Sequence, residues 1–160
     1  MSVNQDRTGQ DRTQIIEGLK CEHNDIINKL RNSLSSSIRS EQGLLEFKKA
    51  EFLLRTHLEN ESFLVYRALM VPPKKKSVVR STENSSAEII RSFNSSLKDI
   101  MEDFFNFSKT LKKDIRSADH ETELLRIIHM IENRFELEET VVFLMYERQQ
   151  PNEPICKSKH

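Results

Sequence analysis

Apolar residues recur alternately three and four positions apart in four long segments of this 160-residue chain, and this spacing constrains the fold most. Such a period turns one face of each helix toward a common core. The four stripes pass through Ile16, Leu19, His23, Ile26 and Leu30; Ala50, Leu54, His57, Glu61, Leu64 and Ala68; Ile90, Phe93, Leu97, Ile100, Phe104, Phe107 and Leu111; and Leu124, Ile127, Ile131, Arg134, Glu138, Val141 and Met145. They predict helices near residues 12–34, 41–70, 86–116 and 120–149.

The composition and the connections between the stripes predict an all-α, antiparallel up-down four-helix bundle. The chain has only three Gly and four Pro and is 31% charged, which suits helices with solvated outer faces and argues against a β-sandwich. The connections are mostly short, as up-down topology requires. We expect the bundle to span residues 12–149, between a flexible N-terminus (1–11) and a disordered tail (150–160).

Polar residues at the predicted helix ends supply the expected caps. The first helix can be capped by Asp11, and Ser85 with Glu88 can form a capping box for the third. Ser117 or Asp119 can cap the fourth helix. The interval after the second helix, "VPPKKKSVVRSTENSS", is long and basic; we interpret it as a solvated loop in preference to a phosphate-binding or localisation patch.

The two halves of the chain also resemble each other. "IIEGLKCEHNDII" aligns with "IIRSFNSSLKDIM", which places His23 over Leu97. "HLENESFLVY" aligns with "RFELEETVVF", which places His57 over Arg134 and Glu61 over Glu138. This predicts an approximate repeat of a helix pair.

The charge balance and hydropathy exclude several classes of partner. The formal net charge is zero, so nothing calls for nucleic acid or an anionic membrane. No stretch approaches the roughly 20 apolar residues of a membrane span, and the polar N-terminus lacks a signal-peptide core. The two cysteines, Cys21 and Cys156, follow no disulfide motif. We expect a cytoplasmic protein.

Five stripe positions are polar, although a stripe should face the core: His23, His57, Glu61, Arg134 and Glu138. An unpaired ion in a core costs roughly several kcal/mol, so these groups should be paired or should hold a metal ion. His57 and Glu61, four residues apart, can offer a nitrogen and an oxygen to one ion. A hydrogen-bonded polar core without metal is the alternative. We favour metal because two histidines and two carboxylates share matching heights.

The remaining histidines do not join this set. His120 falls in a predicted turn, His129 lies off the stripe and His160 is terminal, so all three are expected to be solvated.

The chain resembles the hemerythrin-like, HHE cation-binding family of four-helix bundles over roughly residues 13–146. Members carry a His on the first helix and His-x-x-x-Glu on the second, with the same set repeated on the third and fourth. His23, His57 and Glu61 match the first set. In the second set Leu97 and Arg134 stand where the family has histidines, and Glu138 matches.

The resemblance implies iron, and the departures imply at most one ion per chain. Members with the full ligand set hold two carboxylate-bridged irons and often bind oxygen. Only the first half of that set is complete in this chain, so we expect it to sense or store the ion rather than to transport oxygen. The expected ligands are His23, His57, Glu61 and Glu138, with Glu139 able to replace Glu138. Zinc or manganese would suit these ligands equally.

Arg134 admits two interpretations. Its guanidinium could stand in for the second ion beside the carboxylates, or it could extend from the edge of the stripe to water. The competing function is a metal-free helical bundle that binds a protein partner. In that bundle Arg134 and the carboxylates would form a closed network in the core. An enzyme acting on peroxide or nitric oxide through an open iron position is a weaker third hypothesis, because no redox-active cysteine pair or flavin motif supports it.

Overall fold

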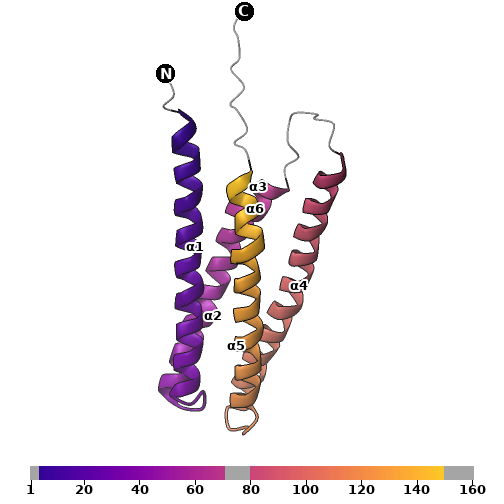
Figure 1. Ribbon diagram of the computed structural model, residues 1–160. Helices are drawn as coiled ribbons and strands as arrows, with labels where there is room; N and C mark the ends of the chain where they lie inside the picture. The colour runs from indigo at the N-terminus through magenta and orange to yellow at the C-terminus, as the bar shows by residue number, and fades with distance from the viewer. Residues whose placement is uncertain (1–3, 71–79, 150–160) are drawn as a thin grey trace, which may run out of the picture.

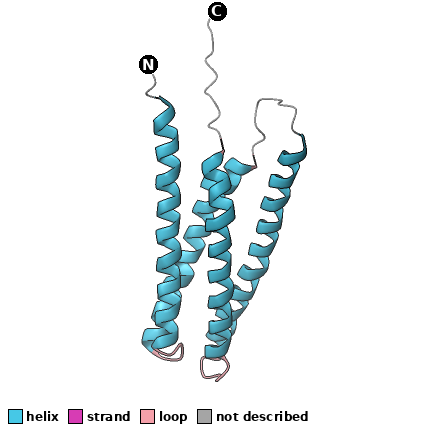
Figure 2. Cartoon of the chain, in the orientation of Figure 1, coloured by secondary structure: helices cyan, strands magenta, loops and turns pink. Residues whose placement is uncertain are grey.

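The computed structural model describes residues 4–70 and 80–149, and in these ranges it contains helices and short turns with no strand (Figure 2). The prediction of an all-α protein is confirmed. The elements are α1 (Asn4–Ser35), α2 (Glu41–Glu61), η1 (Ser62–Tyr66), α3 (Arg67–Leu69), α4 (Arg80–Lys113), α5 (His120–Leu137), η2 (Glu138–Val142) and α6 (Phe143–Arg148). The two η elements are π-helical turns inside otherwise α-helical segments.

These elements make four long helices, because α2, η1 and α3 are continuous, as are α5, η2 and α6. In Figure 1 the chain descends along α1 and returns along α2, then descends along α4 and returns along α5. α1 lies against both α2 and α5, while α4 lies mainly against α5. Toward its N-terminal end α4 leans away from the other helices (Figure 1).

Two predicted helix starts were wrong. α1 begins at Asn4 rather than at residue 12, so Asp11 lies within the helix and does not cap it. α4 begins at Arg80 rather than at residue 86, which puts Ser85 and Glu88 inside the helix as well. Apolar periodicity marks where a helix touches the core and is silent about polar turns that extend beyond it. The predicted tail, with Cys156 and His160, and most of the basic connection lie outside the described residues.

The turn between α1 and α2 brings two backbones into close approach. Ser37 has φ of 59°, and the Ser40 side chain caps α2 by accepting a hydrogen bond from the Gly43 N–H at 2.9 Å. Ser33 Oγ donates to the Gly43 carbonyl at 2.7 Å. A Cβ on Gly43 would lie 2.0 Å from the Ser37 carbonyl oxygen. Glycine is therefore required there by space.

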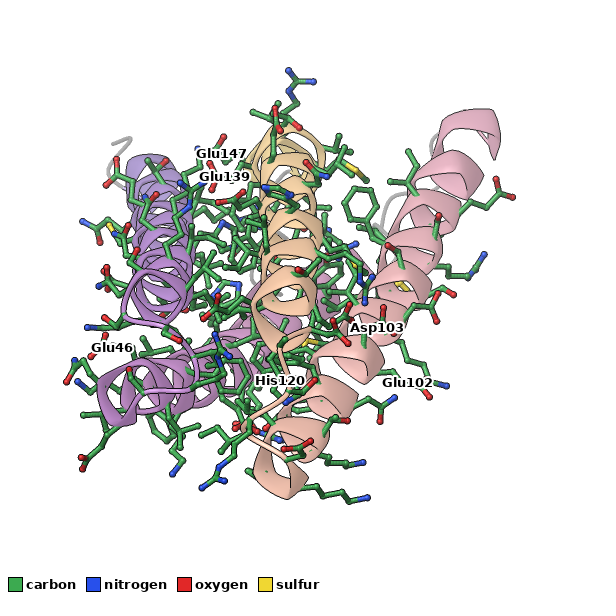
Figure 3. All side chains as sticks on the ribbon, turned by 90° about the horizontal axis from the view of Figure 1, so that it is seen from below. Glu46, Glu102, Asp103, His120, Glu139 and Glu147 are labelled. Carbon is green, nitrogen blue, oxygen red and sulfur yellow. The ribbon has the colours of Figure 1, made fainter. Side chains whose placement is uncertain are left out.

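The prediction of a solvated His120 was wrong. His120 is the first residue of α5, is buried, and donates from Nε2 to the Asp114 carbonyl oxygen (labelled in Figure 3). It closes the α4–α5 turn from inside, packed edge-on against Phe107. Asp119 holds the N-cap position but makes no side-chain cap bond. His129 is exposed, as expected, and Cys21 is exposed as well.

The apolar core is divided into two clusters. The cluster nearer the α1–α2 and α4–α5 turns contains Ile26, Leu30, Ile38, Phe47, Ala50, Leu54, Phe104, Phe107, Leu111, Leu124, Ile127, Ile128, Ile131 and Phe135. The cluster toward the opposite end contains Ile16, Leu19, Val65, Tyr66, Ile90, Val142, Phe143 and Tyr146. Along α1 the first cluster stops at Ile26 and the second begins at Leu19, so His23 lies between them. A polar layer thus separates two apolar layers.

The π-helical turns change which residues face the core. The predicted stripe continued from Glu61 through Leu64 and Ala68, but the fully buried residues are Val65 and Tyr66. In the fourth helix Val142 and Tyr146 are buried in place of Val141 and Met145. A π-turn contains one residue more than an α-turn, so every later side chain is displaced around the helix axis.

Two phenylalanines on the outer side of α2 and η1, Phe52 and Phe63, are 70% and 66% exposed. Among the described residues, no helix combines the length and the apolar character that crossing a membrane would need.

Candidate metal centre

The polar layer is built from three of the four long helices. α1 contributes His23, α2 contributes His57 and Glu61, and the fourth helix contributes Arg134 and Glu138. All five residues are at most 4% exposed. These side chains are thus almost entirely removed from water, and the charges of the layer must be balanced within the protein.

The two histidines face each other through their Nε2 atoms, 3.1 Å apart. On the opposite side of each ring, Nδ1 contacts a carboxylate: His23 Nδ1 lies 2.8 Å from Glu139 Oε1, and His57 Nδ1 lies 2.8 Å from Glu22 Oε2. Carboxylates only accept, so each Nδ1 carries the hydrogen and donates it. In the neutral form of each ring, Nε2 is therefore unprotonated and its lone pair is free.

Aromatic packing fixes the orientation of both rings. Phe135 stacks on His23 with ring centroids 3.8 Å apart and planes 7° from parallel. The same phenylalanine meets the His57 ring nearly edge-on, with centroids 5.4 Å apart. Two lone pairs held in contact repel each other unless a proton or a metal ion lies between them. The pair of imidazoles is arranged to take up a cation.

The two oxygens of Glu138 have different surroundings. Oε1 accepts hydrogen bonds from Arg134 Nε and, at 3.3 Å, from the Tyr66 hydroxyl. Oε2 has no hydrogen-bond partner and lies 3.5 Å from His23 Nε2. Among the described residues, His23, His57 and Glu138 can each offer one ligand atom such that all three atoms lie within 4.8 Å of one another. Glu138, not Glu139, faces the histidine pair, while Glu139 holds His23 from its other side.

Glu61 is the least satisfied group in the layer. It is fully buried, and neither carboxylate oxygen has a hydrogen-bond partner. Burial raises its pKa well above the ordinary value, and the negative charge of Glu138 raises it further. Glu61 does not belong to the three-residue cluster, so its predicted role as a ligand stays a prediction. A buried carboxylate without partners is a group that a bound cation would satisfy.

Arg134 is held inside the protein by all three of its nitrogens. Besides Glu138, it donates from Nη2 to the Tyr66 hydroxyl at 2.5 Å and from Nη1 to the Phe93 carbonyl at 2.8 Å. Its guanidinium also lies 4.5 Å from the centre of the Phe93 ring. Arg134 is 4% exposed, so the interpretation in which it extends to water was wrong. α4 reaches it through Phe93 rather than through Leu97, which is only partly buried.

The charges of the layer shift the pKa values of its other members. Burial lowers the pKa of His57, and a positive charge on His23 lowers it further, so His57 resists protonation. Burial alone would raise the pKa of Glu138, but its contacts with His23 and Arg134 outweigh burial and lower it. Burial, and then Glu61 and Glu138, raise the pKa of Tyr66, which keeps the phenol protonated. Glu138 is thus the ionised carboxylate of the layer.

The two π-helical turns occupy matching places beside the layer. One begins directly after Glu61 and the other begins at Glu138, the two residues that the repeat aligns. π-turns inside α-helices occur frequently at functional sites, where they re-aim side chains. Here the first one brings Tyr66 to the Glu138–Arg134 pair.

A surface pocket of about 300 Å³ leads to the layer between α1 and the fourth helix. Its lining includes His23 at the base and Glu136 and Glu139 nearer the surface. Glu139 is labelled in Figure 3, on the side of its helix that faces α1. The pocket therefore borders the layer at His23, on the side where Glu139 contacts the ring.

Three members of the site were not predicted from the sequence: Glu22, Tyr66, and Glu139 as the partner of His23 Nδ1. Glu22 and Glu139 lie directly beside stripe residues in the sequence, and Tyr66 lies between Leu64 and Ala68 on the other face of a regular α-helix, so periodicity gave no sign of them. The only available signal was adjacency, because Glu22 precedes His23 and Glu139 follows Glu138. Carboxylates that orient ligand histidines through Nδ1 are common around metal sites, and two acidic residues beside predicted ligands could have been tested on that ground.

Comparison of this chain with protein-family models, with curated proteins and with solved structures gives no match.

Proposed function

We propose that this protein binds one transition-metal ion in the polar layer, through His23, His57 and Glu138, with Glu61 as a fourth ligand. The observation that carries the proposal is the pair of Nε2 atoms 3.1 Å apart, each opposite an Nδ1 that is bonded to a carboxylate. Glu138 Oε2 and both oxygens of Glu61 add three buried acceptors without donors. Nitrogen and oxygen lone pairs that converge without donors match the needs of a cation.

The spacing of the histidines fits a shared ion. Imidazole nitrogens lie about 2.0–2.1 Å from a bound zinc ion, so two of them on one ion are about 2.9–3.4 Å apart for angles between a right angle and the tetrahedral angle. The Nε2 atoms fall in this range before any rearrangement. Glu138 Oε2 needs only a small side-chain movement to join them. Glu22 and Glu139 would keep both rings in the ligand tautomer.

Iron is the proposed metal, in a hemerythrin-like site reduced to a single ion. The proposal of iron rests on the resemblance of His23, His57 and Glu61 to the first ligand set of that family. The donor set itself would also accept zinc or manganese. Arg134 lies where the second set would continue, so the second ion has no nitrogen ligand there. We propose sensing or storage of the ion rather than oxygen transport.

Metal titration of the chelated protein tests the proposal. We expect one equivalent of iron(II), zinc or manganese(II) to bind, as followed by calorimetry and by elemental analysis of the desalted protein. His23→Ala and His57→Ala should each weaken binding by at least about 10- to 100-fold, because each removes a ligand that its neighbours hold in place. His129→Ala, which removes an exposed histidine of α5, is the matched control and should bind as the parent does.

Two outcomes would contradict this proposal in different ways. Two equivalents of tightly bound metal would refute the single-ion site. Absence of binding would refute metal binding altogether.

A metal-free interaction module is the second candidate, and the exposed Phe52 and Phe63 are the observation that favours it. In that case a shared proton would satisfy the two Nε2 atoms, and Arg134 would balance the carboxylates permanently. Thermal unfolding distinguishes the two functions. A midpoint that neither chelator nor added metal changes would support the interaction module.

A further inference from the structure

We propose that Arg134 makes this site selective for divalent over trivalent metal ions. The inference rests on the proposed metal binding and concerns which ions the site accepts. Arg134 is buried, always charged and fixed by hydrogen bonds to Glu138, Tyr66 and the Phe93 carbonyl. It therefore acts as a permanent positive charge one side chain away from the ligand atoms.

The charges of the layer limit how much positive charge it can hold. Glu61 and Glu138, both ionised in the metal-bound site, contribute two negative charges, and Arg134 contributes one positive charge, a sum of minus one. A divalent ion would bring the sum to plus one, and a trivalent ion to plus two. The unfavourable energy of a net charge in a poorly solvated interior rises steeply with its size, so the trivalent ion is disfavoured. Glu22 and Glu139 add negative charge, but their side chains are 40% and 33% exposed and water screens them.

Arg134 also weakens one of the two anionic ligands, Glu138. Glu138 shares its Oε1 between Arg134 and the Tyr66 hydroxyl and has only Oε2 free for the histidine side. A carboxylate that already donates electron density to a guanidinium and a phenol is a poorer ligand. The loss is greater for a trivalent ion, which gains more from an anionic ligand than a divalent ion does.

The test is a competition between Zn²⁺ and Ga³⁺, which avoids oxidation and reduction because neither ion changes valence under the conditions. Each ion is supplied from a nitrilotriacetate buffer, and the ratio of its affinities is measured for the parent and three variants. Arg134→Met removes the positive charge, Arg134→Lys keeps it, and Glu61→Gln removes a negative charge but keeps an oxygen. The summed charge of residues 61, 134 and 138 is then minus two in Arg134→Met, minus one in Arg134→Lys as in the parent, and zero in Glu61→Gln.

The preference for Zn²⁺ over Ga³⁺ should follow this order of charge. Relative to the parent, Arg134→Met should shift the ratio toward Ga³⁺ by at least about tenfold, and Glu61→Gln should shift it by a similar factor toward Zn²⁺. Arg134→Lys should stay near the parent. Glu61→Gln removes a buried carboxylate that has no donor, so this variant should fold. It therefore still measures the effect of site charge if Arg134→Met does not fold.

The outcomes separate this inference from the proposed function. If the parent binds Zn²⁺ but the ratio is the same in Glu61→Gln and in every folded Arg134 variant, charge selectivity by Arg134 is wrong while metal binding stands. The inference is also overturned if Arg134→Lys shifts the ratio as much as Arg134→Met does, because shape rather than charge would then be responsible. A parent that binds no Zn²⁺ contradicts the metal site itself.

Discussion

At the scale of single residues, Glu61 and Glu138 show how two like carboxylates in one layer differ. Glu138 has Arg134 and Tyr66 as donors, and its pKa is lowered. Glu61 has no donor at all, and burial together with the charge of Glu138 raises its pKa. In the metal-free protein Glu138 is therefore ionised, while Glu61 holds a proton over a wider range of pH.

Glu61→Gln should stabilise the metal-free protein near neutral pH. A raised pKa in the folded state means that Glu61 favours folding at low pH, and that this contribution is lost as the pH rises through the folded pKa. The variant lacks the loss, so its advantage should grow from acid toward neutral pH and reach about 1–3 kcal/mol, because a neutral amide avoids the cost of ionising a buried group that has no donor. Urea unfolding across this range measures it. Glu138→Gln should do the opposite at neutral pH, because it strands Arg134.

Arg134→Ala should destabilise the metal-free protein by about 3–5 kcal/mol near neutral pH, because Glu138 would keep a buried charge without its partner. The pKa of Glu138 is lowered, so the stabilising contribution is present above its ordinary pKa and is lost as the pH falls through the folded pKa. The loss should therefore shrink in acid. Arg126→Ala is the control on the same helix: Arg126 pairs with Asp103 and Glu123 at the surface, and its removal should cost about 1 kcal/mol or less. Equal denaturation midpoints for the two variants would contradict the balancing role of Arg134.

At the scale of elements, the α1–α2 turn positions His23 against His57. The cap of Ser40 on the Gly43 N–H and the bond from Ser33 to the Gly43 carbonyl hold the two helices at a close approach. The register between α1 and α2 sets which residues meet further along. The distance between the two imidazoles therefore depends on a turn far from them in sequence.

The two helical glycines whose surroundings are known should respond to alanine in opposite directions. Gly43→Ala should destabilise the protein by about 1–3 kcal/mol or more, since its Cβ would meet a backbone oxygen that cannot move aside easily. Gly18→Ala, in α1, finds nothing within 4 Å of its Cβ and should stabilise the protein by about 0.5–1 kcal/mol through helix propensity. Thermal unfolding of both variants provides the comparison. Two losses of similar size would show that space at Gly43 is not the reason.

At the scale of the whole molecule, the polar layer joins two apolar clusters that share no residue. The ligand candidates come from α1, α2 and the fourth helix, while Phe93 of α4 contacts the layer at Arg134 rather than at a ligand candidate. At the far end Arg12 donates to the carbonyl oxygens of Tyr146 and Gln149, which ties α1 to α6 beyond the second cluster. An ion in the layer would therefore link three helices and leave α4 aside.

Hydrogen exchange should reveal this asymmetry. We expect added metal to slow exchange in α1 around His23, in α2 and η1 around Glu61, and in η2, and to change α4 least. Binding to the folded state opposes any opening that separates the ligands, and α4 can open without separating them. Uniform protection of all four helices would indicate that the ion stabilises the fold as a single unit.

Sequence alone determined the four helices and most of the polar layer. A spacing of three and four residues is a property of one helix, so it identified His23, His57, Glu61, Arg134 and Glu138 as core-facing without knowledge of any neighbour. All five are buried together in one layer. The predicted starts of α1 and α4 were less accurate, because Asn4–Asp11 of α1 and the first turn of α4 are helical without an apolar stripe to mark them.

Only the tertiary structure decided which groups meet. Glu22 with His57 and Glu139 with His23 are contacts between helices, and they depend on how each helix is rotated about its axis. Tyr66 reaches Glu138 and Arg134 because a π-turn adds one residue and rotates all that follows, which no repeat of three and four can encode. The burial of Arg134 was decided in the same way, since a long side chain at the edge of a stripe can turn either to water or inward. Phe93, Tyr66 and Glu138 supply the acceptors that keep it inside.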